Sequence, residues 1–232
     1  MFCAFPAPQL WDEKARDVML LFLPVVGLLI GGVWAGLAWL CAWLRLPALV
    51  TGLLLCAYPY LATGFIHLDG FMDVTDALRS WRDLERRREI LRDSRVGSFA
   101  VIGVVLLLLA QFALFASAPA DANPWLLLLI PAVSRCCAAL AVLGLRPMPG
   151  SQYVGHQGPR RRLWIPVCLL AVLLALGFVL CGRGGFALPA CLLGFGLALG
   201  RGYRSLEGMN GDISGYALTI GELCAVAGYA LL

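Results

Sequence analysis

The chain has 232 residues, of which 61% are hydrophobic and 14% are charged, with a formal net charge of +4. Soluble globular domains are about 45–50% apolar and about 25% charged, so this chain has too few polar side chains to cover a folded domain in water. The composition therefore excludes an ordinary soluble enzyme and predicts an integral membrane protein surrounded by the lipid bilayer. We expect no nucleic acid among its partners.

Seven apolar stretches are candidates for membrane-spanning helices, since a helix needs about 20 apolar residues to cross the hydrocarbon core. They are residues 18–44, 46–66, 96–117, 125–145, 163–182, 185–200 and 212–232. We therefore predict an all-α fold, a polytopic integral membrane helical bundle with about seven transmembrane helices. Residues 1–232 would form a single membrane domain, with one long polar connection at 67–95.

The basic residues predict an orientation, because loops on the cytoplasmic side are enriched in Lys and Arg. Lys14 and Arg16 precede the first stretch, and the connections 67–95, 146–162 and 201–211 carry most of the arginines. With seven spans, all of these segments fall on one side. We therefore predict a multi-pass protein of the bacterial inner membrane with a cytoplasmic N-terminus and a cytoplasmic 67–95 connection.

An acidic pattern opens this connection, where residues 64–76 read GFIHLDGFMDVTD. Asp69, Asp73 and Asp76 are spaced i, i+4, i+7, so a helix places the three carboxylates on one face. They repel one another unless a cation lies between them, and their hard oxygen ligands suit Mg²⁺ or Mn²⁺. The alternative is a solvated amphipathic helix with its acidic face in water. The apolar neighbours and the adjoining span favour the metal site.

A basic pattern follows, where residues 79–95 read RSWRDLERRREILRDSR. A surface helix with ion pairs along its faces, lying on anionic headgroups, explains most of Arg82 to Arg88. The final RDSR differs because Asp93 and Arg95 stand directly before the third span, where Gly97 permits a close backbone approach. A basic group beside an acidic metal site suits the binding of a diphosphate.

Two further polar positions lie in apolar stretches. Arg135 is midway along the fourth stretch, where a charge is costly and needs a partner. That partner would be the Asp cluster or a substrate phosphate, or else a carboxylate such as Glu222 in a structural ion pair. Asp212 follows Asn210 and Gly211 and is predicted to cap the last helix. It could also complete the metal site or position a substrate hydroxyl.

Together these motifs resemble the cobalamin synthase family, the adenosylcobinamide-GDP ribazoletransferases. The family typically reads HLDGLADTADG, then a basic helix ending in RDSRxG, and near its end TGDxxGAxxExxE. The matching segments here are GFIHLDGFMDVTDAL at 64–78, RRREILRDSRVGSF at 86–99 and NGDISGYALTIGEL at 210–223. Ala77 departs from the pattern, since the family usually has glycine there.

The resemblance implies a Mg²⁺-dependent phosphotransferase of the last steps of cobalamin biosynthesis. It would join adenosylcobinamide-GDP and α-ribazole, or its 5′-phosphate, to give adenosylcobalamin, or its 5′-phosphate, with release of GMP. Asp69, Asp73 and Asp76 would bind the metal, with Asp212 as a possible fourth carboxylate. His67 would orient an aspartate or act as the base, a role that a carboxylate could equally take. The diphosphate or nucleotide would be bound by Arg92, Asp93, Arg95 and Arg135.

Two other functions are weighed against this one. A CDP-alcohol phosphotransferase also uses clustered aspartates at a membrane edge, but its DGxxAR motif is not matched after Asp69 and Gly70. A small transporter would use Arg135 and Glu222 to line a pathway, and would be supported by broken helices in two corresponding halves. A homo-oligomer is possible, because Gly196 and Gly200 could pack helices within one chain or between two.

Overall fold

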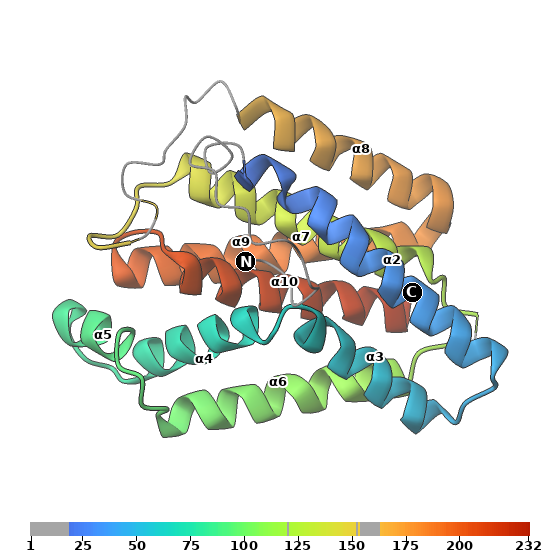
Figure 1. The fold of residues 1–232 in the computed structure, drawn as a ribbon, viewed down its shortest axis with the longest axis horizontal. Coiled ribbons are helices and arrows are strands. Elements are labelled where there is room, and N and C mark those ends of the chain that lie inside the picture. Colours follow the sequence, from blue (N-terminus) through green and yellow to red (C-terminus); the bar gives the residue numbers. More distant parts are fainter. Residues whose placement is uncertain (1–18, 120, 152, 154–162) are drawn as a thin grey trace, which may run out of the picture.

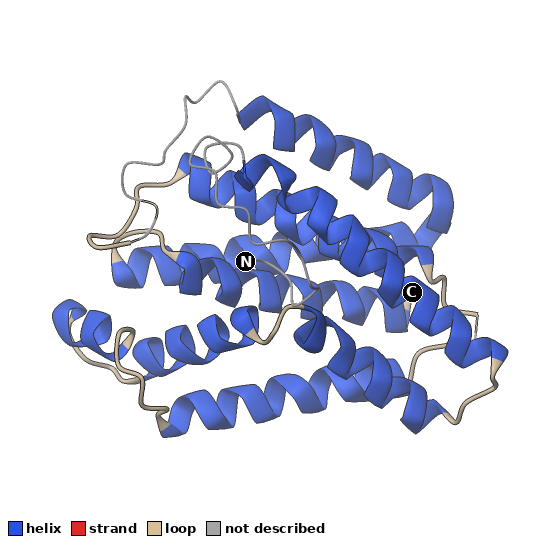
Figure 2. Ribbon diagram, in the orientation of Figure 1, coloured by secondary structure: helices blue, strands red, loops and turns tan. Residues whose placement is uncertain are grey.

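The computed structural model describes residues 19–119, 121–151, 153 and 163–232. These residues contain helices and connections but no strand (Figures 1 and 2). In chain order the elements are η1 (Leu20–Phe22), α2 (Leu23–Trp43), α3 (Ala48–Ala62), α4 (Ile66–Arg79), α5 (Leu84–Ile90), α6 (Ser98–Ala116), α7 (Trp125–Gly144), α8 (Trp164–Cys181), η3 (Gly182–Phe186), α9 (Ala187–Leu206) and α10 (Gly211–Leu231).

Five helical stretches are long and apolar enough to cross a bilayer, or six if α3 and α4 form one bent span. The prediction of an all-α, multi-pass membrane bundle is confirmed. The predicted number was about seven, because the prediction treated α8 and α9 as two spans. In the count above, α8, η3 and α9 form one stretch, Trp164–Leu206. Figure 1 shows the chain reversing at η3.

The second predicted span, 46–66, is wrong as a complete span. Helix α3 has only 15 residues and ends at Ala62, which is about 22 Å at 1.5 Å per residue and short of the hydrocarbon thickness. Gly64 and Phe65 then adopt left-handed backbone angles, with φ of 59° and 63°. The chain bends by 90° there and continues as α4. The acidic helix therefore begins at this bend.

Helix α7 is the central helix of the bundle and is buried along most of its length. Helix α2 packs directly on its backbone, because Gly27 and Gly31 present no side chain. A Cβ atom on Gly27 would lie only 2.5 Å from the carbonyl oxygen of Pro131. Small residues spaced by four allow this close approach in membrane helices. Gly196 and Gly200 differ, since a Cβ there would meet nothing within 4 Å, so neither glycine makes a close contact within the described chain.

The arginine-rich connections meet at one end of the bundle. Arg92 Nη2 donates a hydrogen bond to the carbonyl of Pro149 at 3.1 Å, and an isolated bridge pairs Pro147 with Met209. We call this the charged end and define it as residues 80–97, 145–151 and 207–210. Lys14, Arg16 and residues 160–162 lie outside the described residues.

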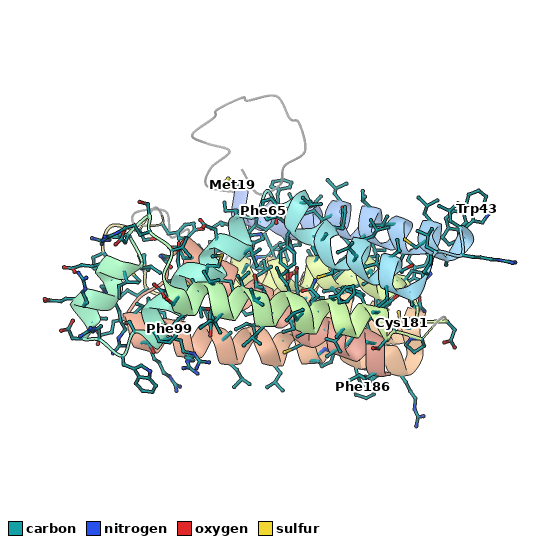
Figure 3. The ribbon with its side chains drawn as sticks, turned by 90° about the horizontal axis from the view of Figure 1, so that it is seen from below. Met19, Trp43, Phe65, Phe99, Cys181 and Phe186 are labelled. Atoms are coloured by element: carbon teal, nitrogen blue, oxygen red, sulfur yellow. The ribbon has the colours of Figure 1, made fainter. Side chains whose placement is uncertain are left out.

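Three further connections meet at the opposite end, which we call the far end. It contains the α2–α3 connection with Arg45, the α6–α7 connection and η3. Asn123 Nδ2 donates to the carbonyl of Leu180 at 3.0 Å across this end. Figure 3 shows Trp43, Cys181 and Phe186 together at this end and Phe99 toward the other. The connections thus separate by charge as the sequence predicts, and the cytoplasmic assignment of the charged end stays a prediction.

Single cysteines at the two ends should react from opposite sides of the membrane. Arg82→Cys should be labelled by a membrane-impermeant maleimide only in inverted vesicles, and Arg45→Cys and Arg183→Cys only in intact spheroplasts. All three side chains are exposed, so accessibility reports topology. The unsubstituted protein measures the background from the chain's own cysteines. Labelling of Arg82→Cys and Arg45→Cys from the same side would contradict the arrangement.

Candidate active site at the charged end

Helix α4 separates an apolar face from an acidic one. Its buried apolar side chains, about three positions apart, are Leu68, Phe71, Val74 and Ala77. Asp69 is exposed, and Asp73 and Asp76 are half-buried. Because the apolar face packs inward, the three carboxylates lie on a separate face, as their spacing predicts.

Two glycines bring α4 and α10 into backbone contact. A Cβ atom on Gly70 would lie 2.9 Å from the Cα of Asp212, and one on Gly215 would lie 3.1 Å from the carbonyl oxygen of His67. The hydroxyl of Thr219 donates to the same carbonyl at 3.3 Å. The structure thereby brings His67 and Asp212, which are predicted site residues from distant segments, next to each other.

The carboxylate of Asp212 joins those of α4 in one electrostatic cluster. The charges of Asp69, Asp76 and Asp212 all act on Asp73, and Asp69 also acts on Asp212. Like charges this close repel, and a hard divalent cation would relieve the repulsion. Within the described residues, however, no three His, Cys, Asp or Glu side chains are placed so that together they hold a metal ion. The donor chemistry thus fits Mg²⁺, and the metal site stays a prediction.

Gly97 holds the start of α6 against the end of the acidic face. It is the N-cap residue of α6, with φ −85° and ψ 164°. A Cβ atom on Gly97 would overlap the carboxylate of Asp76. The close approach predicted at this glycine is therefore made to a proposed metal ligand.

Asp93 and Arg95 pair with each other. Arg95 Nη2 donates to Asp93 Oδ2 at 2.8 Å, and Arg95 Nε donates to both carboxylate oxygens at 3.1 Å. These hydrogen bonds lower the pKa of Asp93 to about 2 and raise the pKa of Arg95. Both groups therefore stay charged at neutral pH, and their charges compensate each other on the surface.

Two cavities share Asp212 in their walls, and the larger one is at the charged end. The larger, about 310 Å³, is also lined by Arg92, Asn210 and the 148–151 loop. The smaller, about 130 Å³, is lined by His67 and Arg135 among mostly apolar residues. Of the predicted site residues, the structure therefore gathers four around these two spaces. The other five, Asp69, Asp73, Asp76, Asp93 and Arg95, are in neither wall.

Arg135 forms a buried ion pair with Glu222. This is the structural ion pair that the sequence analysis offered as one of the alternatives for Arg135. The side chains come from α7 and α10, and Arg135 Nη1 donates to Glu222 Oε1 at 2.5 Å. The residues are only 3% and 9% exposed. Ser134 Oγ donates to the same carboxylate oxygen at 2.7 Å. The hydrogen bonds of Arg135 to described residues all start from Nη1, although Arg135 also lines the smaller cavity.

The cap of α10 is Asn210, which corrects the prediction that Asp212 caps this helix. Asn210 Oδ1 accepts a hydrogen bond from the backbone amide of Ile213 at 2.9 Å. Its Nδ2 donates to Asp212 Oδ2 at 2.7 Å. Asp212 is the second residue of the helix, and it lines both cavities.

The basic helix α5 has a role that the sequence did not reveal. Arg88 donates from Nε and Nη2 to the carbonyl of Leu206, and Arg87 Nη1 donates to the carbonyl of Ser205 at 2.9 Å. Both acceptors are at the end of α9, where helix carbonyls lack intrahelical partners. The two arginines therefore cap α9 and attach α5 to the bundle. No local pattern pairs segments so distant in sequence.

A family model described as cobalamin-5-phosphate synthase matches residues 1–230. The chain belongs to the cobalamin-5-phosphate synthase family. An adenosylcobinamide-GDP ribazoletransferase of Clostridium perfringens strain 13 is 33% identical over 97% of this chain and 92% of its own length. One from Desulfitobacterium hafniense strain Y51 is 33% identical over 89% of this chain and 84% of its own. No solved structure matches the chain.

In this member of the family, the segments that carry the resemblance are the ones that meet in space. The HLDG segment of α4 and the NGD segment at the start of α10 are in contact through Gly70 and Asp212. Ala77, where the family usually has glycine, is fully buried in α4, away from the acidic face. The family membership does not favour a CDP-alcohol phosphotransferase or a transporter.

Removing one member of the buried ion pair should destabilise the bundle strongly. Glu222→Gln leaves Arg135 as an uncompensated buried charge, which should lower the free energy of unfolding by about 3–5 kcal/mol. The double variant Arg135→Met with Glu222→Gln should recover most of this loss. Glu89→Gln is the matched control, because it breaks an exposed pair with Arg86 that should contribute at most about 1 kcal/mol. Equal losses for Glu222→Gln and Glu89→Gln in reversible unfolding would contradict the assignment.

Proposed function

We propose that this chain joins adenosylcobinamide-GDP and α-ribazole, or its 5′-phosphate, with release of GMP, in the last steps of cobalamin biosynthesis. The observation that carries the proposal is the contact of α4 with α10. It sets Asp212 beside the acidic face of α4, next to His67 and in the walls of two cavities. Relatives that match nearly the whole chain are adenosylcobinamide-GDP ribazoletransferases.

We propose Mg²⁺ as the cofactor, with Asp69, Asp73 and Asp76 as ligands and Asp212 as a possible fourth. The support is the mutual repulsion of these carboxylates, which an oxygen-binding cation relieves. Rotation of their side chains would be needed to bring three of them to one ion. When bound, Mg²⁺ would neutralise charge on the diphosphate and on the leaving phosphate.

The basic groups are proposed to bind the substrate's phosphates. Arg92 lines the larger cavity and can present a guanidinium fork to a diphosphate. Arg95, which pairs with Asp93 on the surface, is proposed as a second guanidinium for the phosphates. Because Arg135 donates to the described residues from Nη1 alone, we propose that its Nε and Nη2 donate to a ligand in the smaller cavity.

His67 is proposed to handle the acceptor's proton or to orient a carboxylate that does. It lines the smaller cavity beside Asp212, so a ribazole hydroxyl bound there would be within reach of either group. The apolar remainder of this wall would exclude water from the reacting oxygen. Either group satisfies the requirement of proximity for a general base.

We further propose a location in the bacterial inner membrane with the charged end, and therefore the site, in the cytoplasm. The separation of arginines between the two ends supports this orientation. The substrates are charged, soluble nucleotide derivatives, which agrees with a site at that end. A homo-oligomer remains a proposal, with the outward-facing Gly196 and Gly200 as a possible contact.

The central test is release of GMP by purified protein given Mg²⁺, adenosylcobinamide-GDP and α-ribazole. Asp73→Asn should lower turnover by more than about 100-fold, because even residues that only orient metal ligands contribute about 10–100-fold. Glu85→Gln is the matched control, since it removes an exposed carboxylate at the same end. Full activity of Asp73→Asn across Mg²⁺ concentrations would refute the metal assignment. Absence of GMP with the wild type would refute the function.

Gly97→Ala should reduce turnover by displacing Asp76. The backbone angles of Gly97 suit alanine, and the atoms nearest to an added Cβ are those of the Asp76 carboxylate. Misplacing a reacting group by about 1 Å can cost about 100-fold, and we expect a loss of about 10–100-fold in kcat. Gly36→Ala is the control, because a Cβ there meets nothing within 4 Å. Unchanged kcat in Gly97→Ala would show that Asp76 needs no fixed position.

A further inference from the structure

A cavity at the far end is larger than either cavity of the proposed site. Its volume is about 620 Å³, and it lies between the α2–α3 connection and the α6–α7 connection. Its lining includes Leu55, Phe115 and Tyr229, which are at most 7% exposed. The rings of Phe115 and Tyr229 lie 5.8 Å apart. The deep part of the cavity is therefore apolar and aromatic.

Two charged side chains of opposite sign, Arg45 and Asp121, also line this cavity. Both are exposed. Within the part of the chain that the structure describes, neither forms an ion pair or a side-chain hydrogen bond. They share a cavity without pairing with each other. The cavity therefore offers one cation and one anion, separated, to a ligand.

The tryptophans of α2 indicate where this opening lies relative to a bilayer. Trp39 lines the cavity and stacks on Trp43, with ring centroids 6.4 Å apart. Both are more than 60% exposed. Tryptophans gather at the membrane–water interface, and an arginine at a helix end extends toward the headgroups. The opening with Arg45 is therefore at headgroup level, and the apolar part faces the hydrocarbon.

We propose that this cavity is a binding site for a zwitterionic aminophospholipid, phosphatidylethanolamine. Its phosphate binds the Arg45 guanidinium, its primary ammonium binds the Asp121 carboxylate, and an acyl chain packs on Leu55 and Phe115. A phosphatidylglycerol headgroup has no cation for Asp121. A phosphatidylcholine headgroup carries a quaternary ammonium that has no N–H to donate. The bound lipid connects α2–α3 to α6–α7 and stabilises the far end.

The test compares three lipids with identical acyl chains on delipidated protein in detergent. Phosphatidylethanolamine should raise the Tm most and should be the lipid retained in native mass spectrometry. Arg45→Gln and Asp121→Asn should each weaken its binding by about tenfold, the loss of one charge-assisted contact. Arg183→Gln is the matched control, since Arg183 is an exposed arginine of the far end outside this cavity's lining.

Equal Tm increments from the three lipids would overturn the proposal, as would a larger increment from phosphatidylglycerol. Undiminished phosphatidylethanolamine binding by both Arg45→Gln and Asp121→Asn would also overturn it. Since both side chains are exposed, the substitutions do not threaten folding. The comparison of lipids on the unsubstituted protein stands independently of any variant and of the proposed catalytic function.

Discussion

Helix α4 holds its three carboxylates in place through its other side, which is in backbone contact with α10. Gly70 and Gly215 permit the contact, and Phe71 stacks on Tyr216 with ring centroids 5.7 Å apart. This packing offsets the repulsion among the acids. It also places Asp212 beside them, so that one contact between two helices organises the acidic cluster and both neighbouring cavities.

The amino-acid sequence was sufficient to predict the helical membrane bundle and the acidic face of α4, because both follow from local periodicity and hydropathy. The bend between α3 and α4 could not be predicted in this way. Residues 46–66 meet the length and hydropathy expected of a span, whereas the break depends on left-handed backbone at Gly64 and Phe65. A glycine indicates that such a conformation is allowed, and only the packing of α4 on α10 decides that it is used.

Some partners of the charged residues could be predicted from the sequence, and others could not. The pairing of Arg135 with Glu222 was among the candidates, because few opposite charges are available at that depth in an apolar bundle. The capping of α9 by Arg87 and Arg88 was not, since exposed arginines have many possible partners and the acceptors are backbone carbonyls. The N-cap of α10 is Asn210 and not the predicted Asp212. Both residue types are good N-caps, so the conformation of the preceding turn decides which of the two caps the helix. The cavities arise from several segments and have no local signal.

The dependence of α4 on α10 has a consequence for biogenesis. The chain enters the membrane from its N-terminus, and α3 is too short and α4 too polar for either to be a stable transmembrane helix alone. The surface that holds α4 belongs to α10, which is synthesised after all the other described helices. Until that helix leaves the ribosome, the bent α3–α4 segment and its carboxylates lack their final packing. The proposed site is therefore completed only when α10 packs on α4, and a chain truncated before α10 would lose the position of the acidic helix as well as Asp212.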